Sequence, residues 1–208
     1  MSFKIKNNTY GCLFGQAIGD ALGLGTEFMS KTEVTKNYPT GLTEYHQIIK
    51  DYHRSMFQPG AWGDDTDMMI CIANAMIQDG KINLHTIAKN FQDWVHAPEA
   101  RGIGQTTYKV LAFADYTEKP QQDEPASIGY TLKTLGAALW CLFHSESFED
   151  GLLSVVNEGG DADTNAAVAC AVLGAKFGYD LIPTKYVNGL IQKDKQKKII
   201  EKLIKVVI

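Results

Sequence analysis

The chain has 208 residues, of which 45% are hydrophobic and 21% charged, and its formal net charge at pH 7 is −4. This length is enough for one full hydrophobic core, so we expect a single domain over residues 1–208. An acidic chain offers no basic surface, so nucleic acid is not indicated as a partner. No long apolar run follows the first residues, so we expect no signal peptide and no membrane partner.

Four cysteines lie in apolar stretches of the chain: Cys12, Cys71, Cys141 and Cys170. None belongs to a Cys-x-x-Cys pair, and no histidine stands at the spacing of a zinc site. We therefore expect reduced core cysteines and a cytoplasmic protein.

The first predicted helix spans residues 10–24. It carries a glycine at every fourth position: Gly11, Gly15, Gly19 and Gly23. Each glycine costs a helix roughly 1 kcal/mol relative to alanine, so a whole stripe of them indicates a closely packed neighbour. Small residues recur at the same spacing in a second predicted helix, at positions 166, 170, 174 and 178. We expect these two helices to pack backbone to backbone and to bring Asp20 and Glu27 near the acidic turns described below.

The other predicted elements are helices joined by short polar segments. We expect them at residues 68–78, 83–96, 106–114, 128–143, 148–156 and 188–207, with a short helix after the capping-box residues Ser30 and Glu33. In the helix 83–96, an apolar stripe that starts at Leu84 is expected to face the core. Residues 40–60 are predicted to form a surface loop over the site, and residues 116–126 a linker. No stretch alternates for long enough to be a strand, so the predicted fold class is all-α.

Two acidic turns precede predicted helices: residues 62–67 read WGDDTD, and residues 159–164 read GGDADT. A single turn of this kind is more often a helix cap than a metal site, and Asp163 or Thr164 could cap the helix 165–177. Two such turns placed together would repel each other and raise the carboxyl pKa values unless cations neutralised them. The sequence therefore predicts a magnesium or manganese site with oxygen ligands from both turns: Asp64, Asp65, Asp161, Asp163 and the hydroxyl of Thr164.

Other kinds of site find less support in the sequence. His85 and His96 fall on a predicted helix and are more easily explained as surface or core-edge residues than as ligands. The chain has neither a G-x-S-x-G nucleophile motif nor a GxxxxGK[ST] phosphate loop. The turn at residues 101–104 precedes a helix and could offer N–H groups to a phosphate, although an ordinary turn is the simpler interpretation.

Three motifs, in this order, resemble the ADP-ribosylglycohydrolase family. They are residues 19–23 (GDALG) with Glu27 and Phe28, residues 62–66 (WGDDT) and residues 159–164 (GGDADT). The resemblance implies an all-α bundle with two magnesium or manganese ions in a cleft. It also implies an enzyme that hydrolyses the glycosidic bond between ADP-ribose and a modified acceptor.

The resemblance implies roles for individual residues as well. It assigns the metal ligands to Asp64, Asp65, Asp161, Asp163 and Thr164. Glu27 matches a mobile acidic residue beside the metals and, with Asp65, is expected to act in catalysis. Gly102 and Gly104 match a glycine turn near the diphosphate of the substrate. The implied cofactor is Mg²⁺, with Mn²⁺ as the alternative, and the implied partner is an ADP-ribosylated protein or small molecule bound by a monomer or homodimer.

The sequence departs from the family pattern at two places. Relatives usually carry Thr or Ser directly before the Asp-Asp pair, where its hydroxyl binds metal, whereas this chain has Gly63. A segment with an Asn-Gly-x-x-Met-Arg motif, which lines the pocket of longer relatives, is missing between residues 113 and 127. Two alternatives therefore stay open: a relative that binds metal and ADP-ribose without turnover, and a helical scaffold whose acidic turns only cap helices.

Overall fold

A computed structural model describes residues 3–111 and 128–207 of the chain. Across these two ranges, the regular elements are α-helices and short 3-10 helices, with no strand, which confirms the predicted all-α class. No helix in the described ranges is both long and apolar enough to cross a membrane. The predicted linker 116–126 lies outside the described residues.

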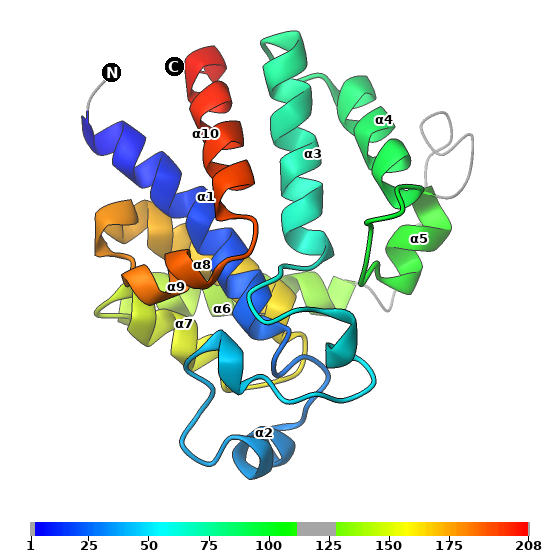
Figure 1. Ribbon diagram of the computed structural model, residues 1–208. Helices are drawn as coiled ribbons and strands as arrows, with labels where there is room; N and C mark the ends of the chain where they lie inside the picture. The colour runs from blue at the N-terminus through cyan, green and yellow to red at the C-terminus, as the bar shows by residue number, and fades with distance from the viewer. Residues whose placement is uncertain (1–2, 112–127, 208) are drawn as a thin grey trace.

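The helices follow one another along the chain with short connections (Figure 1). They are α1 (Phe3–Gly23), α2 (Lys31–Asn37), η1 (Tyr45–Gln47), η2 (Arg54–Met56), α3 (Asp64–Asp79), α4 (Leu84–Val95), α5 (Gln105–Leu111), α6 (Ile128–His144), α7 (Phe148–Val156), α8 (Ala162–Phe177), η3 (Tyr179–Leu181), α9 (Thr184–Gly189) and α10 (Lys193–Val207).

The contact between α1 and α8 lies at the centre of the molecule, where α1 crosses α8 in Figure 1. A Cβ atom added to Gly11, Gly15 or Gly19 would lie only 2.1–2.2 Å from a backbone oxygen of α8. These oxygens belong to Gly174, Cys170 and Ala166, the small residues that the sequence placed on the facing stripe. The predicted backbone-to-backbone packing is therefore confirmed.

This packing also aligns the ends of the two helices. Gly23, at the end of α1, lies against the first turn of α8, because a Cβ there would be 2.4 Å from the Cα of Asp163. α3 begins beside the same end of α1, where the backbone N–H of Gly63 donates to Asp20. The sequence-based expectation that Asp20 lies near an acidic turn is thus confirmed.

The main hydrophobic core surrounds this helix pair. Its large buried side chains include Phe14 and Leu22 of α1, Leu152 of α7 and Leu173 of α8. A smaller cluster around Trp94 joins α3, α4 and α5. The four cysteines are all free, and three of them are buried, which agrees with the prediction of reduced core residues.

Several predicted boundaries are wrong. α1 begins at Phe3, not at residue 10, and its first residues are exposed, so no core contact marked them in the sequence pattern. The predicted helix 188–207 is instead divided into α9 and α10, because Leu190 turns into the core and the N–H of Ile191 donates to Gly60. Leu84 was expected to face the core but is 77% exposed, because it lies at the very start of α4.

Residues 40–60 are irregular, as predicted, but they are not simply a surface loop. They include the short helices η1 and η2, and the side chain of Arg54 is almost completely buried. The short helix α2 follows the predicted capping box of Ser30 and Glu33, and both hydrogen bonds of that box are present. α5 ends at Leu111 within the described residues, so the rest of the predicted helix 106–114 lies outside them.

Candidate active site

The start of α3 is capped by a side chain from α1. Asp20 is fully buried, and its carboxylate accepts hydrogen bonds from the N–H groups of Gly63 and Thr66 at 2.7 and 2.9 Å and from the Thr66 hydroxyl at 2.6 Å. These donors are the N-cap and third helical residues, whose N–H groups have no partner inside the helix. Asp20 therefore does the capping that a residue of the turn itself would otherwise do.

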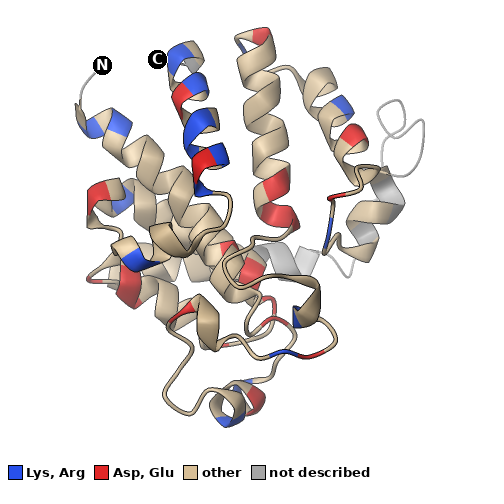
Figure 2. Ribbon diagram, in the orientation of Figure 1, with Lys and Arg blue, Asp and Glu red and all other residues tan. Residues whose placement is uncertain are grey.

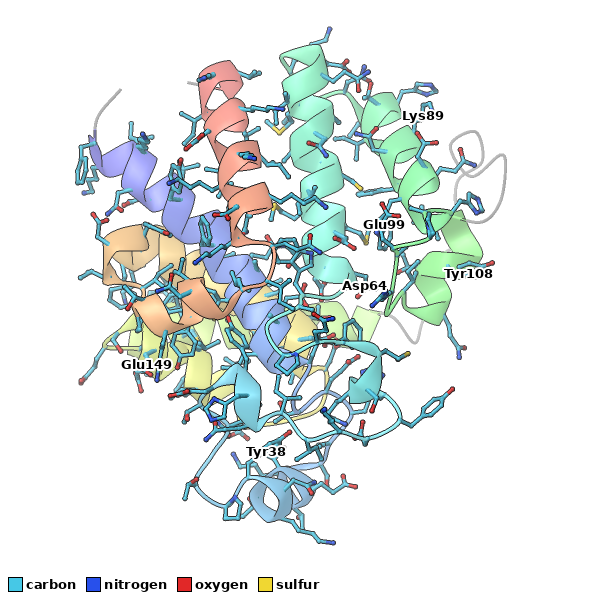
Figure 3. All side chains as sticks on the ribbon, viewed as in Figure 1. Tyr38, Asp64, Lys89, Glu99, Tyr108 and Glu149 are labelled. Atoms are coloured by element: carbon cyan, nitrogen blue, oxygen red, sulfur yellow. The ribbon has the colours of Figure 1, made fainter. Side chains whose placement is uncertain are left out.

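Because of this cap from outside, the acidic residues of α3 are free for other contacts. The N-cap residue Gly63 has no side chain to offer, and Asp67 accepts hydrogen bonds from the indoles of Trp62 and Trp94 at 3.0 and 3.1 Å. Asp67 is thus held in the structure, whereas Asp64 and Asp65 face the start of α8. Figure 3 labels Asp64 at the start of α3, next to the segment that leads to α5.

The start of α8 is shaped by glycine. Gly159 and Gly160 have φ angles of 74° and 72°, a region that other residues rarely adopt. Gly160 exchanges two backbone hydrogen bonds of 2.7 Å with Phe28 and Met29, which fixes the turn to the segment after α1. α8 then begins at Ala162, so the expectation that Asp163 or Thr164 caps it is wrong: both lie inside its first turn.

The two acidic turns meet, as the sequence predicted. Asp64, Asp65 and Asp163 each offer a carboxylate oxygen, and these oxygens lie within 4.8 Å of one another. The Thr164 hydroxyl is next to them and donates to Asp65 at 3.2 Å. In Figure 2, acidic residues gather at the start of α3 and around the end of α1.

Asp163 has a buried oxygen without a partner. Its side chain is 5% exposed, and its Oδ1 atom accepts no hydrogen bond. Among the described residues, no lysine or arginine forms an ion pair with Asp64, Asp65 or Asp163. An unpaired buried carboxylate oxygen is costly, and all-oxygen donors are what Mg²⁺ and Mn²⁺ prefer, so these residues fit a hard divalent cation.

The raised pKa values of these carboxyl groups also fit a site for a divalent cation. Burial is the main cause that raises the pKa of Asp65 to about 7, and the neighbouring charges of Asp64 and Asp161 add to it. Burial first, and then the charges of Glu27, Asp20 and Asp65, raise the pKa of Asp163 well above its usual value. A bound cation would reverse this trend by favouring the ionised carboxylates.

Asp161 and the glycine turn occupy the edge of this group. Asp161 lies outside the set of three close carboxylates, although its charge raises the pKa values of Asp64 and Glu27. Gly102 has a φ of 70°, and the N–H of Gly104 donates to Asp64 Oδ2 at 3.1 Å. The glycine turn therefore adjoins the acidic group, and its predicted contact with a diphosphate stays a prediction.

Glu27 lies beside the acidic group, as expected from its position after α1. It is 8% exposed, and burial raises its pKa, with the charges of Asp64 and Asp161 adding to the effect. The sequence did not predict its partner, His53, whose Nε2 atom lies 2.5 Å from Glu27 Oε2. No motif marks His53, and only the fold of residues 40–60 brings it to Glu27.

Comparisons with known proteins identify relatives of this chain. A model of the family "ADP-ribosylglycohydrolase" matches residues 1–127 and 112–207. The chain is 23% identical to ADP-ribosylarginine hydrolase Tri1 of Serratia proteamaculans, over 93% of this chain and 78% of the relative. It is 22% identical to ADP-ribosyl-[dinitrogen reductase] glycohydrolase of Rhodospirillum rubrum, over 91% of this chain and 92% of the relative.

The chain is shorter than these relatives. The alignment with Tri1 extends over 295 positions, more than the 208 residues of this chain, so the relative contains segments that this chain lacks. A family match in two pieces that overlap at residues 112–127 is expected if such a segment is missing there.

A solved structure gives the fold independently. The "ADP-ribosylglycohydrolase-related protein complex" superimposes with a TM-score of 0.72 at 20% identity, over 98% of this chain and 99% of that one. An all-α fold of the same kind thus occurs in a chain of similar extent. With the family model matching both halves of the sequence, the chain belongs to the ADP-ribosylglycohydrolase family.

Proposed function

We propose that the protein is a divalent-metal-dependent hydrolase that releases ADP-ribose from a modified arginine. The observation that carries the proposal is the group of Asp64, Asp65 and the buried Asp163, with an oxygen of Asp163 left unpaired. The choice of arginine is supported by the two relatives named as ADP-ribosylarginine hydrolases, of Serratia proteamaculans and Pseudomonas putida.

The ligand set in this proposal comes from both acidic turns. Asp64, Asp65 and Asp163 would bind Mg²⁺ directly, and the Thr164 hydroxyl and Asp161 would complete the set. A bound divalent cation supplies Lewis acidity and neutralises the carboxylates around it. Two ions are proposed because the ligands extend from Asp64 at the start of α3 to Asp161 before α8.

The reaction is a hydrolysis at the anomeric carbon of the ribose. The bond from this carbon to the guanidine nitrogen breaks, water supplies the hydroxyl of the released ADP-ribose, and the leaving nitrogen takes up a proton. Such bonds break through an oxocarbenium-like transition state, in which a carboxylate helps to activate the water. In our proposal Glu27 orients this water, and Asp65 holds its negative charge next to the reacting centre.

A second candidate is a relative that binds metal and ADP-ribose without turnover. Gly63 favours it, because this position provides no hydroxyl ligand. A Cβ at Gly63 would lie 3.0 Å from Asp20 Oδ1, so a hydroxyl-bearing residue could enter only if Asp20 shifted. The absence of the Asn-Gly-x-x-Met-Arg segment from the sequence would remove part of the pocket wall in the same candidate.

Calorimetry and hydrolysis assays test the two candidates together. We would titrate ADP-ribose into the wild type and Asp163→Asn, with Mg²⁺ or with EDTA, and then assay release of ADP-ribose from ADP-ribosylated arginine. Metal-dependent binding and release by the wild type, both lost in Asp163→Asn, is the expected result. Asp180→Asn, an exposed carboxylate on η3, is the matched control.

The other outcomes are equally definite. Metal-dependent ADP-ribose binding without release from arginine or serine linkages would establish the binding protein. Absence of binding under every condition would contradict both candidates and leave the scaffold alternative.

A further inference from the structure

His53 contacts Glu27 from a segment far away in the sequence. The two side chains are 24% and 11% exposed, and the His53 Nε2 to Glu27 Oε2 distance is 2.5 Å. A partly buried hydrogen bond to a carboxylate is among the stronger ones, and it fixes the orientation of both groups. An ionised Glu27 carboxylate can only accept, so in that form the hydrogen bond requires a proton on His53 Nε2.

The His53 ring is itself held in place by two aromatic side chains. The ring centroid of Phe28 is 5.1 Å away at an interplanar angle of 61°, and that of Phe57 is 6.0 Å away at 64°. These are edge-to-face arrangements, the geometry that aromatic rings prefer. Phe28 keeps this position with a φ of 62°, unusual for an aromatic residue, and so accepts backbone strain beside the site.

The neighbouring residue Arg54 holds the backbone of the same turn. Its Nε atom donates to the carbonyl of Gly25 at 2.8 Å, and its Nη2 atom donates to the carbonyl of Glu27 at 2.5 Å. Asp51 accepts from the guanidinium and from the Arg54 N–H, which fixes Arg54 in turn. Two successive residues therefore hold Glu27: Arg54 binds its main-chain carbonyl, and His53 binds its carboxylate.

The contact with His53 opposes the electrostatic repulsion between Glu27 and the neighbouring carboxylates. Glu27 lies among the charges of Asp64, Asp161 and Asp163, so repulsion would drive a free Glu27 side chain outward toward solvent. A hydrogen-bond donor that holds the carboxylate counteracts that repulsion. His53 is that donor, and the rings of Phe28 and Phe57 keep it from turning away.

We propose that His53 is a positioning residue: its imidazole holds the Glu27 carboxylate beside the Asp64, Asp65 and Asp163 group in the orientation that hydrolysis needs. The inference rests on the proposed function, because it gives Glu27 a part in the reaction. It adds a residue that none of the sequence motifs contains. His53 does not itself touch the substrate in this proposal.

The kinetic test compares two substitutions at His53. His53→Gln keeps an N–H donor near the position of Nε2, whereas His53→Leu keeps a similar volume without a donor. Misplacing a reacting group by about 1 Å can cost on the order of 100-fold in rate, so we expect His53→Leu to lower kcat by about 10- to 100-fold. We expect KM to change less than about twofold and His53→Gln to recover most of kcat.

The control is His46→Leu, in the same irregular segment. The His46 side chain is 75% exposed and pairs with the nearby Glu44, so its loss should leave kcat and KM unchanged. Thermal unfolding of each variant confirms that it is folded. Wild-type kcat in His53→Leu, or an equal loss in His53→Gln and His53→Leu, would overturn the proposal.

A structural test separates this proposal from the proposed function. Crystal structures of the wild type, His53→Gln and His53→Leu should show the Glu27 carboxylate in one place in the first two and displaced in the third. If the wild type hydrolyses no substrate, the proposed function fails, and this displacement alone decides whether His53 positions Glu27. An unmoved Glu27 carboxylate in His53→Leu contradicts the proposal in either case.

Discussion

The two acidic turns resemble each other in sequence but are built differently. At the start of α3, other parts of the molecule provide the structural contacts: Asp20 caps the helix and two indoles bind Asp67. At the start of α8, the backbone holds the turn: Gly159 and Gly160 have positive φ angles, and Gly160 forms two hydrogen bonds with Phe28 and Met29 after α1. In both turns the remaining carboxylates are left without a capping role.

This difference explains how a short acidic motif can serve a site instead of a helix. An Asp in a turn normally caps the following helix by accepting its free N–H groups. Here Asp20 caps α3 and no side chain caps α8, so Asp64, Asp65 and Asp163 converge without capping either helix. The comparison can be tested by removing, one at a time, the contacts that hold the two acidic turns in place.

The largest effect is expected where α1 meets the acidic turn of α8. Gly23→Ala adds a methyl group 2.4 Å from the Cα of Asp163, where only backbone could yield. We expect a loss of about 3 kcal/mol in the free energy of unfolding, at the upper end for overpacking, measured in urea with EDTA. The cation-induced stabilisation should be lost as well.

A matched glycine makes this result interpretable. Gly136 of α6 is exposed, and a Cβ there meets nothing within 4 Å. Gly136→Ala should therefore gain up to about 1 kcal/mol from helix propensity. Equal stability of Gly23→Ala and the wild type would show that this contact does not position Asp163.

The next effect compares Asp20, whose side chain caps α3, with Asp161, the N-cap residue of α8, whose side chain makes no capping hydrogen bond. Asp20→Ala leaves two N–H groups and a buried hydroxyl without an acceptor, so we expect a loss of about 2 kcal/mol in urea unfolding. Asp161→Ala removes no capping hydrogen bond and should stay within about 0.5 kcal/mol of the wild type. If both variants lost the same stability, the contrast between the two turns would be wrong.

The third effect is the response to a divalent cation. At a concentration about 10 times its Kd, Mn²⁺ or Mg²⁺ should stabilise the folded wild type by about 1.4 kcal/mol, which corresponds to roughly 3–6 °C in Tm. Asp163→Asn, which changes the buried unpaired oxygen, should lose most of this shift, whereas Asp180→Asn should keep it. A full shift in Asp163→Asn would remove Asp163 from the ligand set.

The smallest effect is the pH dependence of that response. The pKa of Asp65 is about 7 in the folded chain against an ordinary value of 3.8, so the folded state holds this proton more tightly than the unfolded state. Without metal, stability should therefore fall as the pH rises from about 4 to about 7. Added cation should raise Tm more at pH 8 than at pH 5, because protons compete for the same oxygens. Thermal unfolding with EDTA or Mg²⁺ at both pH values measures this, and an equal shift would contradict it.

Much of the fold could be predicted from the sequence. The glycine stripe of α1 required a close neighbour, and the small residues of α8 identified that neighbour, as the contacts of Gly11 and Gly19 confirm. The break between α9 and α10 could not be predicted, because it depends on Leu190 entering a core built by distant segments. The exposed start of α1 was missed for the opposite reason, since a helix without core contacts shows no apolar periodicity.

The candidate site, too, has features that the sequence predicts and features that only the tertiary structure shows. Helical period and side-chain volume are local properties, so the sequence by itself determined that α1 and α8 pack closely and that two acidic turns meet at their ends. Hydrogen-bond partners depend on contacts between segments far apart in the chain. Only the tertiary structure decided that Asp20 caps α3, that the unpaired oxygen belongs to Asp163, and that His53 holds Glu27, because each contact joins residues that no local pattern relates.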